Sequence, residues 1–368
     1  MRKLKNLFDA GLVRELASDF SRADADFDAA GFVEWGLDGL EGLELTARAW
    51  HLAEALRKYL PHSFSRAANV LVASLGPEMP PTGENGLAPL RCMPHVCFVQ
   101  KYGLDDFEAA MHAQYEITKR FSAEWSIRAF LLRYPRDTYA RLLQWAGDDN
   151  AHVRRLVSEG TRPRLPWAPR LRAFQKDPRP VIRLLELLKD DPERYVQRSV
   201  ANNLNDISKD HPDLAVEVCR RWLWGAPRGR EWIVKHALRS LVKNGHRGAL
   251  EALGVHRKPE VRVSGVRLSP KDVKLGDVLR FSCEITSVGK EDQELLIDYA
   301  VHFVKANGTT RPKVFKLRRI VLSPSARVDL RGAVSFEDLT TRRHHPGSHR
   351  IDLLINGVTH PLAEFEVL

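Results

Sequence analysis

The stretch RDTYARLLQWAGDDNAHVRRLVSEG at residues 136–160 has the same layout as RPVIRLLELLKDDPERYVQRSVANNLND at residues 179–206. In both stretches an amphipathic segment is followed by a pair of aspartates and then by a second amphipathic segment. The apolar residues recur at steps of three and four, which places them on one face of an α-helix. Each stretch is therefore predicted to form a helical hairpin.

A looser third copy follows at residues 211–245. With Val153, Val196 and Val234 taken as equivalent, the spacings are 43 and 38 residues, close to the ~40–47 residues of HEAT and armadillo repeats. A single hairpin cannot cover its own apolar face, so neighbouring hairpins must stack into a curved solenoid. A concave face follows from that stacking.

The chain before these repeats is also predicted to be helical. Residues 43–60, LELTARAWHLAEALRKYL, carry the same periodicity and stop before Pro61. Residues 79–94 are rich in proline and glycine, so we expect a surface loop there, followed by a helix at residues 104–121.

After Lys258 the pattern changes to the period of two that is typical of β-strands. The alternating runs lie at residues 279–286, 295–303, 315–317, 328–330, 351–355 and 365–367. Short strands separated by turns predict an immunoglobulin-like sandwich of ~100 residues. We therefore expect a multidomain chain, with an all-α HEAT-like repeat solenoid at residues 1–258 and an all-β immunoglobulin-like sandwich at residues 262–368.

Composition favours a polyanionic partner such as nucleic acid, because 57 Lys and Arg residues outnumber 47 Asp and Glu residues. No run approaches the ~20 apolar residues of a membrane span, and the first residues are charged rather than signal-like. We expect a cytoplasmic protein without membrane contact. The four cysteines are too few to staple the fold, and Cys92, His95 and Cys97 lack the second half of a zinc site, so no metal is expected.

A basic segment joins the first two repeats. Its seven cations face one acid, Asp177, and surround Trp167, an arrangement that suits a phosphate backbone and an aromatic platform. The cations are Arg162, Arg164, Arg170, Arg172, Lys176, Arg179 and Arg183. A solvated loop stiffened by prolines explains the segment equally well. Arg342 and Arg343 begin a second basic loop, which either contacts phosphates or is simply exposed.

Three acids are predicted at or near the C-terminal ends of second helices, where a solenoid presents its concave face: Glu124, Glu159 and Asp206. Carboxylates that converge on a basic surface could stabilise a developing cation and hold a water molecule for attack. The ordinary alternative is a set of first-turn, surface and capping residues. Trp125 and Trp232 stand among apolar neighbours, so both are predicted to pack in the core.

Three motifs resemble the AlkC group of the HEAT-like-repeat alkylpurine DNA glycosylases. They are EWSIRAFLLRYP at residues 124–135, VRRLVSEGTRPRLPWA at residues 153–168 and SVANNLNDISKDHP at residues 199–212. Residues 43–61 are similar to that group as well, and the likeness covers most of residues 1–255. Part of the group also carries a C-terminal immunoglobulin-like domain.

The resemblance implies base-excision repair of double-stranded DNA, with release of small cationic alkylated bases, mainly 3-methyladenine and, as a second candidate, 3-methylcytosine. Glu124, Glu159 and Asp206 match acids of the lesion site, and Trp167 matches an aromatic residue of the DNA-facing surface. Members are thought to bend the duplex and leave the base largely stacked. No cofactor and no obligate protein partner are implied, and a monomer that wraps DNA is the simplest expectation.

The competing interpretation is a non-catalytic helical-repeat scaffold that binds nucleic acid or protein through its concave face. It accounts for the repeats and the positive charge. It does not account for three acids beside a basic segment, because carboxylates repel phosphates. Binding of RNA is a weaker third interpretation, since the sequence contains no RNA-recognition module.

Overall fold

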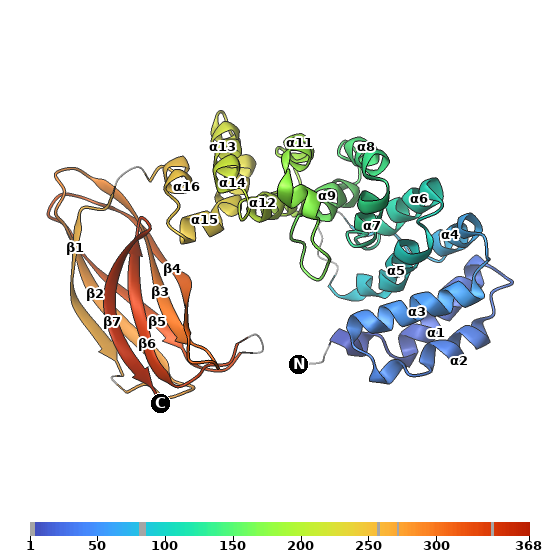
Figure 1. The fold of residues 1–368 in the computed structure, drawn as a ribbon, viewed down its shortest axis with the longest axis horizontal. Coiled ribbons are helices and arrows are strands. Elements are labelled where there is room, and N and C mark those ends of the chain that lie inside the picture. Colours follow the sequence, from blue (N-terminus) through green and yellow to red (C-terminus); the bar gives the residue numbers. More distant parts are fainter. Residues whose placement is uncertain (1–3, 81–85, 256–257, 271, 340–341) are drawn as a thin grey trace. The chain divides into compact units, whose positions relative to one another are not determined.

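The computed structural model describes residues 4–368 except for residues 81–85, 256–257, 271 and 340–341. The chain forms two compact units. One comprises Met1–His211 and Arg221–Ala237, and the other comprises Pro212–Arg220 and Leu238–Leu368. Figure 1 shows helices through the first two thirds of the chain and strands in the last third, so the predicted fold class is confirmed.

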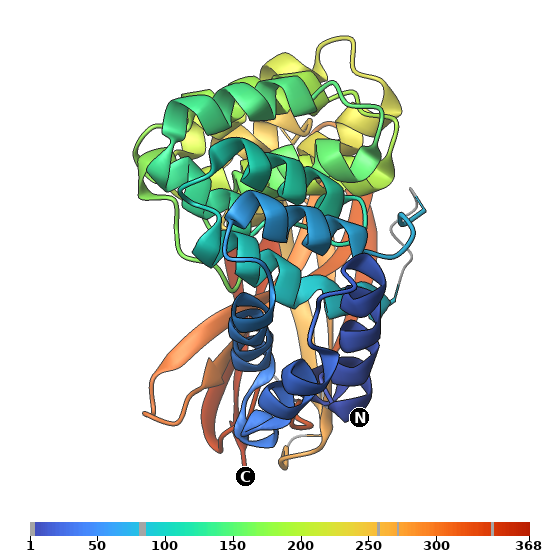
Figure 2. The same ribbon diagram turned by 90° about the vertical axis from the view of Figure 1, so that its right-hand side faces the viewer.

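The first unit is built from helices, and longer segments separate α4 from α5 and α9 from α10. Figure 2 shows its later helices overlapping one behind another, as stacked hairpins do. The α-helices are α1 (Ala10–Ala23), α2 (Ala29–Leu37), α3 (Leu45–Tyr59), α4 (Phe64–Ala73), α5 (Met93–Tyr102), α6 (Phe107–Thr118), α7 (Ser126–Arg133), α8 (Pro135–Trp145), α9 (Ala151–Gly160), α10 (Arg172–Lys176), α11 (Arg179–Leu188), α12 (Arg194–Ile207) and α14 (Arg228–Ala237). Short 3₁₀ helices are η1 (Leu4–Leu7), η2 (Leu40–Gly42) and η3 (Ala88–Cys92).

The two predicted hairpins are α8 with α9 and α11 with α12, and α9 packs against α12. Val153, Val196 and Val234, the residues used to align the repeats, are all fully buried. The paired aspartates form the same turn in both hairpins. Oδ1 of Asp148 accepts a hydrogen bond from the backbone N–H two residues later, and so does Oδ1 of Asp191. These bonds organise the backbone at the entry to the second helix.

The expected loop at residues 79–94 is too long. The helix α5 begins at Met93, and η3 precedes it, whereas the next helix after the predicted loop was expected only at residue 104. Every residue from Met93 to Val99 is buried. A helix that is apolar on all sides has no polar face, and therefore no amphipathic period by which to recognise it.

The strands of the second unit form two antiparallel sheets that enclose one apolar core. Their orders are β1-β2-β5 and β4-β3-β6-β7. The strands are β1 (Val261–Ser269), β2 (Val278–Ser287), β3 (Gln293–Val304), β4 (Thr310–Leu322), β5 (Arg327–Ser335), β6 (Gly347–Ile355) and β7 (Val358–Val367). Inward residues alternate along β2 and β3, including Phe281 and Ile285 of β2, as the period of two requires.

The same unit also contains most of α13 (Pro212–Leu223), together with α15 (Arg239–Lys243) and α16 (Arg247–Ala252). Gly245 and Gly357 both have positive φ, and their backbones approach so closely that a Cβ on Gly357 would lie 2.6 Å from Cα of Gly245. The turn between α15 and α16, together with Leu250 of α16, therefore packs against the β6–β7 turn. The expected boundary between residues 258 and 262 stays a prediction, because this unit begins before the change from helix to strand.

Within the part of the chain that the structure describes, no helix is long and apolar enough to cross a membrane.

Candidate functional site

Acidic and basic side chains alternate in one row near the ends of α9 and α12. We call this row the charged ladder, and its members in order are Glu124, Arg155, Glu159, Arg162, Asp206 and Lys209. Arg155 lies between two acids, with Nη1 3.1 Å from Oε2 of Glu124 and Nη2 3.7 Å from Oε2 of Glu159. Each carboxylate therefore has at least one cation beside it.

Arg162 bridges two repeats. Its Nη1 donates to Oε1 of Glu159 at 2.7 Å, and its Nε donates to Oδ2 of Asp206 at 2.9 Å. Lys209 completes the row, since its Nζ donates to Oδ1 of Asp206 at 2.8 Å. Glu159 and Asp206 are each the penultimate residue of their helix. Because α9 packs against α12, the C-terminal ends of these two second helices lie close enough for Arg162 to reach both acids.

Glu159 is held in its ionised form by its surroundings. Burial alone raises the pKa of this carboxyl, but the guanidinium groups of Arg155 and Arg162 and hydrogen bonds from Ser199 and Arg162 outweigh burial, so the pKa lies below its ordinary value. Ser199 donates to Oε2 of Glu159 at 2.6 Å and itself accepts a hydrogen bond from Ser158. Glu159 therefore places a fixed negative charge at the end of α9.

The ladder borders a cavity of about 400 Å³. Its aromatic walls are Phe121, Trp125, Trp167 and Tyr195, and its polar lining includes Ser122, Glu124, Arg155, Glu159 and Arg162. Asp206 is not part of the lining, and its side chain is only 2% exposed. Aromatic faces together with carboxylates suit a flat cationic group, because both stabilise positive charge.

Glu124 differs from Glu159 in how its oxygens are used. Its Oε2 accepts hydrogen bonds from Oγ of Ser122 at 2.8 Å and from Arg155. Its Oε1 has no polar partner among the described residues. In Glu159 both oxygens are occupied, by Arg162 and by Ser199. Glu124 can therefore accept a hydrogen bond from a molecule in the cavity without breaking the ladder.

Trp167 stands at the mouth of the cavity with its side chain directed into solvent. The residue is 78% exposed, and its φ is 61°, a left-handed conformation that is costly for a bulky residue. A large apolar ring kept exposed by a strained backbone is a candidate contact surface for a ligand.

A buried arginine organises the segment that carries Arg162 and Trp167. Nη1 of Arg128, on α7, donates to the carbonyl oxygens of Gly160 at 3.0 Å and Arg162 at 2.8 Å, and Nη2 donates to the carbonyl oxygen of Pro169. Burial lowers the pKa of Arg128 to about 10, so it stays charged at neutral pH. Three carbonyl groups of an irregular segment are thereby fixed to a helix.

The sandwich has a second group of cations between β3, β4 and the loop that follows β5. They line a cavity of about 420 Å³, which we call the basic hollow, and they are Lys305, Arg311, Lys313, Arg342 and Arg343, with His345 beside them in the lining. None of the residues lining it is acidic. Burial and the nearby charges of Arg342 and Lys243 lower the pKa of Lys313, as expected where like charges gather without counter-ions.

The side chains of Cys92, His95 and Cys97 are buried and make packing contacts. His95 stacks on Phe20, with a ring-centroid distance of 5.3 Å, and its Nε2 lies 3.2 Å from Oγ of Ser74. Cys92 and Cys97 are buried free thiols. In the described ranges of the chain, no three His, Cys, Asp or Glu side chains are grouped as a metal ion would require.

Comparisons with known proteins agree with this architecture. The family described as DNA alkylation repair enzyme matches residues 120–240, and the family described as the C-terminal Ig-like domain of the uncharacterised protein YhaZ matches residues 262–368. The chain is 35% identical to the uncharacterized protein YhaZ of Bacillus subtilis, over 100% of both sequences. Among solved structures it is similar to the Pseudomonas fluorescens alkylpurine DNA glycosylase AlkC bound to DNA containing an abasic site analog, with a TM-score of 0.91, 37% identity and complete coverage of both chains.

The chain belongs to the AlkC-type DNA alkylation repair family.

In this AlkC-type chain, Glu124 does not lie where the sequence analysis expected it. The prediction of a helix end is wrong for this residue, because α6 ends at Thr118 and Glu124 lies in the turn just before α7. Its carboxylate nevertheless reaches the ladder through Arg155. The prediction of core packing is wrong for Trp125, which is only half-buried and lines the cavity. Trp232 is also half-buried, stacked between Arg194 and His236.

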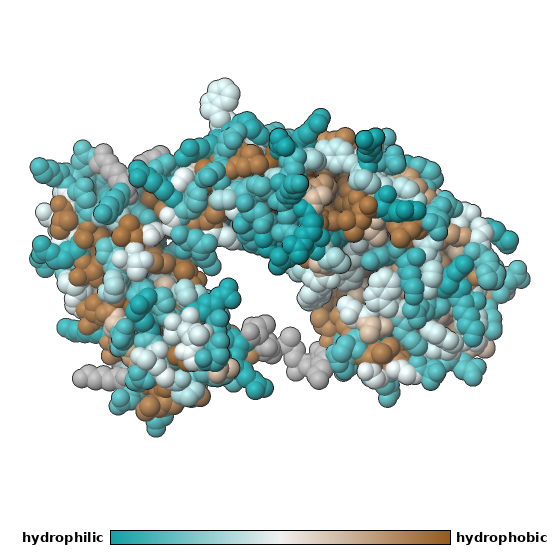
Figure 3. Space-filling view, in the orientation of Figure 1, coloured by the Kyte–Doolittle hydropathy of each residue, from teal (hydrophilic) through white to brown (hydrophobic). Residues whose placement is uncertain are grey.

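The cations of residues 161–183 have more acidic partners than Asp177 alone. Arg162 is inside the ladder, and its side chain is 11% exposed. Arg164 pairs with Asp210 at 2.9 Å, whereas Arg170 is exposed. The polar surface over this segment is visible in Figure 3. Arg162 is thus placed to orient carboxylates, whereas Arg170 is exposed to solvent.

Arg155, Tyr195 and Ser199 also contact the site, and none of them was predicted from the sequence. A helical spacing could have indicated them. Arg155 lies four residues before Glu159 on α9, and Tyr195 lies four residues before Ser199 on α12, so each pair shares one helix face. Arg155 also lies over the Tyr195 ring, 4.7 Å from its centroid.

Proposed function

We propose that the chain is a DNA glycosylase that hydrolyses the N-glycosidic bond of small cationic alkylated bases in double-stranded DNA. The observation that carries this proposal is the cavity of about 400 Å³ that combines aromatic walls with the carboxylates of Glu124 and Glu159. The membership of the DNA alkylation repair family and the similarity to AlkC support it. The proposed main substrate is 3-methyladenine, with 3-methylcytosine as a second substrate.

The chemistry needs little help with the leaving group. Alkylation at N3 gives the base a positive charge and weakens its bond to the sugar, so the base departs neutral with the electrons of that bond. A cationic, oxocarbenium-like sugar remains. Glu159 stabilises this charge electrostatically. A water molecule then adds to C1′ and gives up a proton, and the products are a free base and an abasic site.

We assign different roles to the three acids. Glu124, which keeps one oxygen available, orients the attacking water and accepts its proton. Glu159 supplies fixed negative charge beside the sugar. Asp206 lies behind Arg162 and outside the cavity, so we assign it a positioning role: it holds the guanidinium that in turn holds Glu159.

The DNA would be held by groups outside the ladder. In this proposal Arg164 and Arg170 contact phosphates, Trp167 packs against the lesion strand, and Arg342 and Arg343 of the basic hollow contact a second stretch of backbone. The solenoid, residues 1–258, would be catalytic, and the sandwich, residues 262–368, would be an accessory DNA-binding domain. The duplex bends and the base stays largely stacked. We further propose a monomer that acts in the cytoplasm without an obligate protein partner.

The test is release of 3-methyladenine from methylated duplex DNA by the purified full chain and by Glu124→Gln, Glu159→Gln and Asp206→Asn. We expect Glu124→Gln to lose roughly 10²- to 10⁴-fold in rate, as removal of a general base does, and Glu159→Gln to lose roughly 10²- to 10³-fold, as removal of an electrostatic stabiliser does. Asp206→Asn should lose less, roughly tenfold. Glu108→Gln, which removes an acid that is 75% exposed on α6, serves as the control.

Binding to duplex DNA with an abasic-site analogue is measured for every variant, so that lost catalysis is separated from lost binding. DNA binding without any base release by the wild type would reject the glycosylase and favour the non-catalytic scaffold. Equal losses in all three acid variants would reject the separate role of Asp206.

A further inference from the structure

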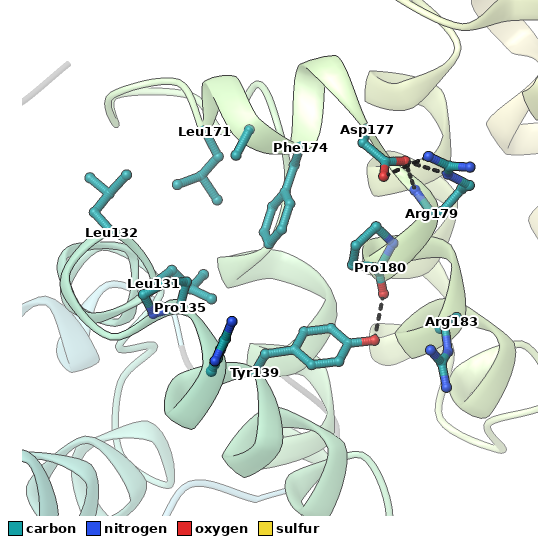
Figure 4. A pocket seen from close by; sticks show the side chains of 12 residues that line it. Leu131, Leu132, Pro135, Tyr139, Leu171, Phe174, Asp177, Arg179, Pro180 and Arg183 are labelled. Carbon is teal, nitrogen blue, oxygen red and sulfur yellow. Dashed lines mark hydrogen bonds and ion pairs between the residues drawn. The ribbon is translucent and has the colours of Figure 1, made fainter.

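An apolar groove lies on the helical unit away from the charged ladder, between α7, α8, α10 and α11. Its volume is about 420 Å³, within the ~300–1,000 Å³ range of pockets that bind small ligands. Figure 4 shows its side chains, with Leu131, Leu132 and Pro135 on one side and Leu171 and Phe174 on the other. The groove and the cavity of the ladder share no lining residue.

A hydrogen bond fixes the floor of the groove, and part of the apolar surface of the groove is exposed to solvent. Tyr139 crosses the floor, and its hydroxyl donates to the carbonyl oxygen of Pro180 at 3.0 Å. Leu132 is 66% exposed although it lies beside buried Leu131. Figure 3 shows apolar surface on the helical unit where Figure 1 places α8 and α11. A contiguous apolar surface bordered by polar residues marks an interaction site more often than a single exposed leucine does.

The rim of the groove carries an excess of positive charge. Arg136, Arg179 and Arg183 stand on it with one acid, Asp177. Asp177 is paired with Arg179, whose Nε donates to Oδ1 at 2.7 Å. Arg136 and Arg183 are exposed and have no ion-pair partner in the ranges that the structure describes. Two cations thus face solvent on the rim of an apolar floor.

We propose that this groove binds an acidic peptide segment of a partner protein that inserts one or two apolar side chains between Leu132 and Phe174. The carboxylates of the segment would pair with Arg136 and Arg183. A DNA backbone would use the arginines but leave the apolar floor unfilled, and an apolar ligand without acids would use the floor but leave the arginines unpaired. An acidic peptide with an apolar anchor uses both features.

The test is fluorescence anisotropy of a labelled ten-residue peptide with a central Phe-Leu pair and Asp on both sides, added to the full chain. We expect saturable binding that Leu132→Ser and Arg183→Ser each weaken at least about fivefold, since each removes one of the two recognition features. Leu187→Ser and Arg66→Ser are matched controls, because both residues are exposed and lie outside the groove. They should change the affinity less than about twofold.

Two further arms define the partner class. Peptides with Ser-Ser in place of Phe-Leu, or Lys in place of Asp, should not bind. Unlabelled duplex DNA should not displace the acidic peptide; displacement, together with weaker DNA binding by Leu132→Ser, would overturn the proposal and assign the groove to DNA. Absence of saturable binding, or equal weakening by the controls, would also overturn it.

Base release by Leu132→Ser separates this inference from the proposed glycosylase function. We expect it to match the wild type, because Leu132 does not line the cavity of the ladder. Groove-dependent peptide binding by a chain that releases no base would leave this inference intact and reject only the glycosylase.

Discussion

Buried carboxylates are costly unless cations and hydrogen bonds compensate for lost water. Glu159 is compensated on both oxygens, by Arg162 at 2.7 Å and by Ser199 at 2.6 Å. Ser199 receives its own hydrogen bond from Ser158 at 2.6 Å, so its hydroxyl proton is directed at the carboxylate. A neutral serine therefore helps to determine the protonation state of an acid in the proposed active site.

Replacing Ser199 with alanine should move the acid limb of the pH–rate profile to higher pH. Ser199 lowers the pKa of Glu159, so loss of its hydrogen bond raises that pKa, and protonation removes the negative charge at a less acidic pH. The rate of base release at neutral pH should fall by roughly tenfold or less. Ser199→Thr keeps the hydroxyl and should restore the profile. A profile that only scales down, without moving along the pH axis, would show that Ser199 acts by packing alone.

His95 makes a second prediction at the scale of one residue. Burial, and secondarily the charge of Arg91, lower the pKa of His95 from 6.5 to about 3. Below pH 6.5 His95 is therefore protonated in the unfolded chain but stays neutral in the folded chain. As a result the free energy of unfolding falls as the pH drops from 6.5 toward 3. Between pH 7 and 5 this amounts to about 2 kcal/mol.

Urea unfolding of the wild type and of His95→Gln at several pH values measures this effect. The variant should be less stable at pH 7 but should lose about 2 kcal/mol less than the wild type on acidification to pH 5. His112→Gln, at an exposed position on α6, should keep the slope of the wild type. Parallel pH curves for wild type and His95→Gln would contradict the assignment.

At the scale of elements, the segment between α9 and α10 depends on α7. Arg128 binds three of its carbonyl oxygens, and the segment carries both Arg162 and Trp167. Arg128→Lys keeps the charge but cannot reach three carbonyl groups from one planar group. We expect base release to fall by roughly ten- to a hundredfold, since a displacement of about 1 Å can cost that much.

Hydrogen exchange identifies the cause of that loss. Amides of residues 161–171 should exchange faster in Arg128→Lys than in the wild type, whereas α11 and α12 should keep their protection. Arg133→Lys, at an exposed position at the end of α7, should leave both rate and exchange unchanged. Lost activity with unchanged exchange in residues 161–171 would place the effect of Arg128 elsewhere.

The hairpins were predictable because each helix buries one face and leaves the other in water. The strands from Leu279 onward were predictable for the same reason with a period of two. The period of two did not predict the strand β1, because buried and exposed residues do not alternate along it. Its pairing with β2 also shifts register between Ser264 and Arg267. A strand of this kind is held by backbone hydrogen bonds to its neighbour, and these bonds do not produce a recognisable hydropathy pattern in the sequence.

The candidate site was predictable only in part, because the sequence around one residue does not show which side chains of the next repeat it pairs with. Glu159 and Asp206 could be found because each lies near the predicted C-terminal end of the second helix of its hairpin. Arg162 looked like a free cation of a basic segment, and only the packing of α9 against α12 shows that it bridges both acids. Trp125 looked like a core residue because its neighbours in sequence are apolar.

At the scale of the whole molecule, the formal net charge of +10 does not show where the cations without acidic partners lie. Many arginines of the helical unit are matched by acids, as in the ladder, and such matched charges contribute little to attraction of a polyanion. The basic hollow of the sandwich differs, because its five Lys and Arg side chains have no acid among the lining residues. It should therefore supply a larger share of the DNA attraction than the fraction of the total charge it holds.

The salt dependence of DNA binding tests this distribution. For a protein that releases counter-ions, the slope of log Kobs against log salt concentration is about −0.9 per neutralised phosphate. Arg342→Ala combined with Arg343→Ala should weaken binding at low salt and reduce the slope by about 1.8, two contacts' worth. Arg262→Ala combined with Arg318→Ala removes the same charge from exposed positions of the sandwich outside the hollow, and it should change the slope little. If both double variants reduce the slope equally, net charge rather than the basic hollow attracts the DNA, and the sandwich loses its proposed place in the DNA-binding surface.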